Sequence, residues 1–203
     1  KGQLVGIVAS GGEGRNEAIP ASALIDLRLD SGPEFLDASL KIGAAYRQCV
    51  EGLDRVKQNR APLEPGDMRE LGDICLSTHT RQLIDLAGQA LGMHRDIDGA
   101  LKLLLKSHEL DPNAPNSIIS LAITYHIAGR YADEIPVLYR GLDLLPKEPQ
   151  LLRLALQAGI WGKDQALADR AMAQIEKEMP AMAPAARNVY NAVPPAPRLK
   201  SPN

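Results

Sequence analysis

Aromatic residues are scarce in this chain of 203 residues: they make up 3% of the total, although hydrophobic residues together make up 45%. A core with so few large rings must be built mainly from leucine, isoleucine and alanine, which suits closely packed helices better than a β-sandwich. The net charge is only −2 and there is no basic block, so we do not expect a nucleic acid as partner. No run reaches the roughly 18 apolar residues that a membrane span needs.

Residues suited to metal binding or redox chemistry are also few. Two cysteines, Cys49 and Cys75, do not make a disulfide framework, and both lie in helix-patterned runs with apolar neighbours. We expect two buried free thiols, with a single bridge between two helices as the alternative. The histidines lack the paired spacing of helical zinc sites, so we expect them at the surface or at an interface, and we expect neither a metal nor a cofactor. They are His79, His94, His108 and His126.

Proline returns at a fixed interval in the second half of the chain. Pro112, Pro146 and Pro180 are equally spaced, and each closes a helix-patterned run. Their spacing matches the period of about 34 residues that is typical of tetratricopeptide repeats, in which each unit is a pair of antiparallel helices. The chain resembles this family, and the resemblance implies a mainly α-helical solenoid. An irregular helical bundle with accidental spacing is the alternative.

The residues inside this frame favour three repeats, at about 81–114, 115–148 and 149–182, within a repeat region at 80–182. The middle repeat fits the family pattern best, and the flanking repeats are degenerate, as terminal repeats often are. One position where the two helices cross holds Ala100, Glu134 and Ala168 in the three repeats. In the middle repeat, Gly129 is placed to end the first helix in a left-handed turn. Asp133 is then expected to cap the second helix, which would put Pro136 in its first turn.

The first thirty residues have a different character. Residues 3–9 read as a short β-strand, a glycine-rich turn follows, and residues 17–20 read as a second strand that proline stops. A helix capped by Ser22 is expected after them. An isolated hairpin is marginally stable in water, so these strands should belong to a larger sheet.

These residues resemble the end of the protease domain in trypsin-like serine peptidases of the HtrA type. Gly2, Leu4, Val5, Gly6 and Ile7 match one strand of that family, and Ala18-Ile19-Pro20 matches the next. The resemblance is confined to this first segment and implies that residues 1–29 are the remnant of a trypsin-like β-barrel. It also implies that the substrate side-chain pocket is bordered by Val8, Ala9, Ser10, Glu17, Ala18 and Ile19.

The resemblance places the catalytic triad upstream of Lys1, so we expect no catalytic residue in this chain. Ser10 and Ser22 lie in no nucleophile motif. The parent protein would be a trypsin-like endopeptidase, and the family favours an exported or periplasmic location. A stray hairpin that caps the helices is the alternative.

The remaining segments are a connector and a tail. Residues 30–79 are expected to form a helical connector with a long helix at 34–58 and a second at 67–76, outside the repeat frame. Phe35, Ile42, Cys49 and Val56 recur at every seventh position on one face of the long helix. A self-associating coiled coil is the alternative for this helix. Residues 183–203 are expected to hold a capping helix, at about 185–193, and a proline-rich tail.

Stacked helix pairs leave a concave groove lined by the first helix of each pair, where we expect another protein or peptide to bind. The expected lining has a single arginine and is otherwise mostly amide and isoleucine, so it does not suit a carboxylate clamp. Ile119 and Ile123 could equally pack against the next helix. The groove candidates are Gln82, Asp85, Gln89, Asn116, Ile119, Ile123, His126, Gln150, Arg153 and Gln157.

Two functions follow from these observations. In the first, the chain is the interaction region of a trypsin-like peptidase, and its partners are a polypeptide in the groove, the upstream protease domain or a second copy of the chain. In the second, it is a free-standing repeat adaptor without any relationship to peptidases.

Overall fold

A computed structural model describes residues 6–12, 15–20, 33–58 and 64–192 of the chain. The helix expected after Ser22 and the proline-rich tail lie outside the described residues. The chain divides into two compact units, at residues 1–41 and 42–203.

The first unit contains an antiparallel hairpin. Strand β1 (Gly6–Gly12) pairs with strand β2 (Arg15–Pro20), so that Ile7 lies opposite Ile19 and Gly12 lies opposite Arg15. The register shifts between Val8 and Ser10.

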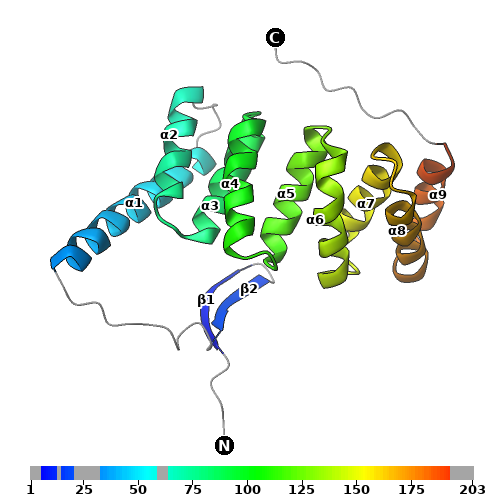
Figure 1. Cartoon of the computed structure of the whole chain (residues 1–203), viewed down its shortest axis with the longest axis horizontal. Coiled ribbons are helices and arrows are strands. Elements are labelled where there is room, and N and C mark those ends of the chain that lie inside the picture. Colours follow the sequence, from blue (N-terminus) through cyan, green and yellow to red (C-terminus); the bar gives the residue numbers. More distant parts are fainter. Residues whose placement is uncertain (1–5, 13–14, 21–32, 59–63, 193–203) are drawn as a thin grey trace, which may run out of the picture. The chain divides into compact units, whose positions relative to one another are not determined.

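The rest of the described chain is helical, and consecutive helices stand side by side from α3 onwards (Figure 1). The helices are α1 (Pro33–Gln58), α2 (Pro65–Leu76), α3 (Arg81–Met93), α4 (Ile97–Leu110), α5 (Pro115–Ile127), α6 (Tyr131–Leu144), α7 (Pro149–Trp161), α8 (Gln165–Glu178) and α9 (Ala183–Ala192). The chain is therefore mainly α-helical with a solenoid-like stack of helix pairs.

Helix boundaries recur with the period seen in the sequence. The helices α3, α5, α7 and α9 begin at equal intervals, at Arg81, Pro115, Pro149 and Ala183. The helices α4, α6 and α8 also begin and end at this same interval. We call α3, α5 and α7 the first helices, and α4, α6 and α8 the second helices.

The turn inside each pair repeats as well. Arg95, Gly129 and Lys163 have φ of 65°, 68° and 62°, and these three left-handed residues follow the same interval. In the middle pair, the Gly129 N–H donates to the His126 carbonyl at 3.0 Å and the Arg130 N–H donates to the Tyr125 carbonyl at 2.9 Å. This pair of hydrogen bonds is the Schellman ending, which turns the chain out of the helix at a left-handed residue. The left-handed turn predicted at Gly129 is confirmed.

The predicted cap of the following helix is wrong. Helix α6 begins at Tyr131, and Arg130 is the residue before it. The Schellman turn ends at Arg130, so the next helix starts immediately after the turn. The turns of the other two pairs have the same hydrogen bonds. Asp133 lies in the first turn instead and accepts a 2.7 Å hydrogen bond from Arg130 Nε. Pro136 is consequently inside the helix and not in its first turn.

Two clusters of buried side chains hold the helical unit together. One joins α1 to α4 around Cys49, Leu71 and Leu103, and the other joins α4 to α9 around Leu121, Leu138 and Leu154. Each fully buried leucine contributes about 2 kcal/mol. The last described helix, α9, packs on α7 and α8, and its residues Ala183 and Ala186 belong to the second cluster.

The expectation of two free thiols is wrong, because Cys49 of α1 and Cys75 of α2 form a disulfide. Both cysteines are fully buried. The bridge lies where α1 and α2 pack closely: a Cβ on Gly52 would lie 2.3 Å from Leu71 Cδ1.

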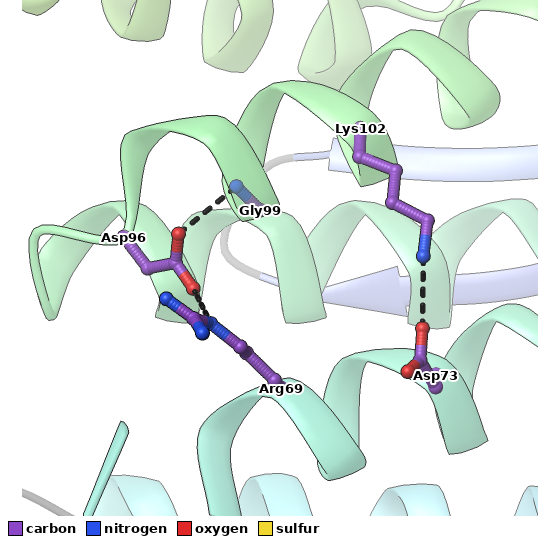
Figure 2. Close-up of polar contacts among 5 residues, drawn as sticks. All are labelled: Arg69, Asp73, Asp96, Gly99 and Lys102. Carbon is purple, nitrogen blue, oxygen red and sulfur yellow. Dashed lines mark hydrogen bonds and ion pairs between the residues drawn. The ribbon is translucent and has the colours of Figure 1, made fainter. Parts of the chain in front are cut away.

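Polar contacts fasten α2 to the first repeat (Figure 2). Arg69 Nε lies 3.0 Å from Asp96 Oδ2, and Lys102 Nζ lies 2.9 Å from Asp73 Oδ1. Asp96 also accepts from the Gly99 N–H at 3.0 Å and so caps α4. Burial disfavours the Asp96 carboxylate, but the bonds from Arg69 and Gly99 outweigh it and lower the pKa of Asp96.

Candidate protein-binding face

The predicted binding residues lie on one side of the first helices, which we call the first-helix face. Two of them contribute little surface, because Asp85 is 3% exposed and Ile119 is 7% exposed and belongs to the core. Arg153 is exposed. The remaining candidates are Gln82, Gln89, Asn116, Ile123, His126, Gln150 and Gln157, and most of these are half-buried.

Several polar groups on this face are bonded to one another. Gln89 Nε2 donates to Asp85 Oδ2 at 2.7 Å, and Ser107 Oγ of α4 lies 3.5 Å from Asp85 Oδ1. On α7, Arg153 Nη1 donates to Gln157 Oε1 at 3.2 Å. Asp85 therefore points toward α4 and links the two helices by polar contacts. The accessible part of the first-helix face consists mainly of apolar and amide side chains.

The middle repeat contains a buried histidine–glutamate pair that was not predicted from the sequence. His126 Nδ1 lies 3.1 Å and 3.0 Å from the two carboxyl oxygens of Glu134, whose side chain is completely buried. Glu134 stands where the neighbouring repeats have Ala100 and Ala168, and that exception was the signal in the sequence. Burial raises the pKa of Glu134, while His126 and Arg153 act in the opposite direction.

Three rings meet around this pair. The centroid of the His126 ring lies 5.3 Å from that of Tyr131 and 5.4 Å from that of Trp161, and the Tyr131 and Trp161 centroids are 5.2 Å apart. Such contacts are worth about 1 kcal/mol each beyond the area that they bury. His126 is thus fixed by a carboxylate on α6 and by a ring on α7, and it ties the middle repeat to the third.

Large apolar side chains continue the first-helix face at the ends of its helices. Met93, Ile127 and Trp161 are the last residues of α3, α5 and α7, and so they recur at the repeat interval. Met93 is 76% exposed, Ile127 is 50% exposed and Trp161 is half-buried. We call these three residues the apolar row. None of these three residues was among the predicted binding residues, which on α5 stop at His126, one residue before Ile127.

The six residues of the predicted peptidase pocket lie on the hairpin of the first unit. Val8, Ala9 and Ser10 belong to β1, and Glu17, Ala18 and Ile19 belong to β2. Val8 is paired with Ala18 and Ser10 with Glu17, and Ala9 stands at the register shift between them.

Among the described residues, no group of three or more His, Cys, Asp or Glu side chains is placed to hold a metal ion. Within the same part of the chain, no helix combines the length and the apolar character required to cross a bilayer. The chain matches no family model and no curated protein sequence.

Proposed function

We propose that this chain is a protein-interaction module of tetratricopeptide-repeat type, and that its first-helix face binds a segment of another polypeptide. The observation that carries the proposal is the recurrence, at the repeat interval, of a left-handed turn residue between paired helices. In repeat proteins of this kind each unit contacts only its neighbours, so the stack leaves a continuous surface for a partner.

The distribution of charge supports the first-helix face as that surface. The first helices carry only Arg81, Asp85 and Arg153 as charged residues besides His126, and Asp85 is buried. A surface depleted in charge and provided with large apolar side chains has the composition found at the centre of protein interfaces.

A displayed library of random peptides tests the proposal. Peptides should be selected on the wild-type chain, on Ile123→Glu in the first-helix face and on Leu105→Glu, which changes an exposed leucine of α4. Circular dichroism would first establish that both variants are folded. We expect the enriched peptides to bind the wild-type chain and the Leu105→Glu variant but not the Ile123→Glu variant. No enrichment, or enrichment that Ile123→Glu leaves unchanged, would overturn the proposal.

We further propose that the hairpin is the end of a trypsin-like protease domain, so that the module follows a peptidase in the parent protein. The order of a strand, a glycine-rich turn and a second strand ending at Pro20 supports this. The Cys49–Cys75 disulfide supports export, because disulfides persist mainly in oxidising compartments.

The gene sequence upstream of Lys1 tests the peptidase proposal. We expect it to encode the serine nucleophile motif of this family, and an active-site serine probe should label the parent protein but not the present chain. Labelling of this chain by itself, or an upstream sequence that has no such motif, would contradict the proposal.

A further inference from the structure

The apolar row is the feature of the first-helix face that best defines a partner. Its three residues occupy the same place on three successive first helices, one helical turn beyond Gln89, Ile123 and Gln157. Large side chains exposed as much as Met93 and Ile127 contribute little to the core of the described part of the chain. Their recurrence at the repeat period indicates one apolar contact for each repeat.

The distance between these contacts sets the geometry of the partner. Each first helix packs against the next one, and packed helices have axes roughly 8–10 Å apart. Two turns of an α-helix rise about 10.5 Å. A partner helix that runs along the stack would therefore offer one apolar residue to each member of the row if its apolar residues recur at every seventh position.

Hydrogen bonding favours a helix over an extended peptide at this face. An extended segment needs partners for its backbone N–H and C=O groups. Part of the hydrogen-bonding capacity of the amides next to the row is already used, since Gln89 Nε2 donates to Asp85 and Gln157 Oε1 accepts from Arg153. A helix satisfies its own backbone groups and needs only the apolar contacts.

Charge adds a second property of the partner. Arg153 is exposed, whereas both carboxylates next to the face, Asp85 and Glu134, are buried. Arg153 is thus the exposed charge among the predicted face residues, and an acidic residue of the partner placed next to it would complement it.

We propose that the apolar row and Arg153 bind an amphipathic α-helix that carries an apolar residue at every seventh position and acidic residues along one edge of that stripe. This inference rests on the proposed function of the first-helix face and specifies the class of its partner.

Three synthetic helical peptides of about 21 residues, or three heptads, test it. The first has leucine at heptad positions with glutamate beside the leucines. The second has the same composition with the leucines dispersed around the helix, and the third has lysine in place of glutamate. Trp161 is the only tryptophan of the chain, so its fluorescence reports occupation of the row directly. Calorimetry would provide the affinities.

We expect the first peptide to bind at least about tenfold more tightly than the dispersed one. Ile127→Glu should weaken it by a similar factor, while Leu110→Glu, a matched change of a leucine that is 45% exposed at the end of α4, should leave it within about twofold. Wild type should prefer glutamate to lysine in the peptide, and Arg153→Gln should abolish this preference.

Equal binding of the heptad and dispersed peptides, or an equal effect of Ile127→Glu and Leu110→Glu, would overturn the inference. The library selection keeps this failure distinct from failure of the proposed function. Ligands that depend on Ile123 but are extended or proline-rich would contradict only the helical partner. The absence of any ligand dependent on Ile123 would contradict both.

Discussion

The first and second helices of the repeats use charge in opposite ways. The helices α4, α6 and α8 carry four, four and five charged residues, against three in all on α3, α5 and α7. Several charges of the second helices are paired with a neighbouring element, as Lys102 is with Asp73 of α2 and Arg170 is with Asp143 of α6. Apolar side chains end both kinds of helix, but those of the first helices are the more exposed: Met93 and Ile127 are 76% and 50% exposed, against 45% for Leu110 and 38% for Leu144 at the ends of α4 and α6.

This difference is the basis for proposing the first-helix face as the binding side. An ion pair between α6 and α8 adds to the polar character of the second helices, whereas the exposed members of the apolar row, Met93 and Ile127, give the first helices an apolar end that we propose a partner covers. Between the two sides lie the contacts that join each first helix to its second helix. Substitutions at these contacts should have the largest effects on stability, and substitutions on the outer polar side should have the smallest.

The largest effect is expected where the two helices of the third repeat cross. A Cβ at Gly159 of α7 would lie 2.6 Å from the Ala168 nitrogen and 2.9 Å from the Asp164 carbonyl oxygen, and these backbone atoms cannot move aside easily. Gly159→Ala should lower the free energy of unfolding by about 3 kcal/mol. Urea unfolding followed by Trp161 fluorescence would measure it.

Gly43→Ala in α1 is the matched control, because no atom lies within 4 Å of the added Cβ. This variant should be more stable than wild type by about 0.5–1 kcal/mol, since alanine favours a helix over glycine. Similar stabilities for the two variants would show that the first and second helices do not cross as closely as described.

A smaller loss is expected from the buried pair of the middle repeat. His126→Ala removes the partner of Glu134 and two ring contacts, and should cost about 2 kcal/mol in the free energy of unfolding. His94→Ala, just beyond the end of α3, should stay within about 0.5 kcal/mol of wild type. If both substitutions lowered the free energy of unfolding equally, the contact between His126 and Glu134 would not be a specific source of stability.

The same pair should make stability depend on pH. Burial raises the pKa of Glu134 above its ordinary value of 4.5, so the folded state favours the protonated side chain. The resulting contribution to the free energy of unfolding is fully present below pH 4.5 and is lost as the pH rises through the folded pKa. Glu134→Gln does not titrate, so its free energy of unfolding should increase relative to wild type as the pH rises from 4.5. A series of urea titrations measures this difference, and a difference that is flat or falls with pH contradicts the raised pKa.

The smallest effect is expected on the outer polar side. Arg170 Nη2 lies 2.7 Å from Asp143 Oδ1, and both side chains are substantially exposed to water. A double-mutant cycle of Arg170→Ala and Asp143→Ala should give a coupling of about 0.5 kcal/mol that decreases with added salt. A coupling energy as large as the loss of stability in His126→Ala would mean that the exposed ion pair of the second helices stabilises the fold as much as the buried His126–Glu134 contact. That result would contradict the comparison between the two kinds of helix.

The regular parts of the fold could be predicted from the sequence because the same signal occurs repeatedly. Gly129 indicated its left-handed turn, and the regular spacing of prolines indicated the helix pairs. The prediction that Asp133 caps α6 was wrong, although aspartate is a common capping residue. The position of the preceding turn determines where that helix begins. The left-handed Arg95 and Lys163 have no comparable signal, since neither residue favours positive φ.

Contacts between separate helices were harder to predict. The Cys49–Cys75 bridge depends on how closely α1 packs on α2, which the spacing of two cysteines does not encode. Most predicted face residues are partly accessible, but Asp85 and Ile119 are buried by the neighbouring helices. In the sequence, Glu134 stands out only because it is a charged residue at a position where the other repeats have alanine. Its partner His126 could be identified only once the turn between α5 and α6 was seen in the structure.

Oxidative footprinting of the chain with and without the heptad peptide tests the central claim most directly. Met93 lies in the apolar row and is 76% exposed, whereas Met182 lies between α8 and α9 and is 37% exposed. The account predicts that the peptide slows oxidation of Met93 and Trp161 and leaves that of Met182 unchanged. Protection of Met182 with undiminished oxidation of Met93 would place the partner elsewhere and contradict the assignment of the first-helix face.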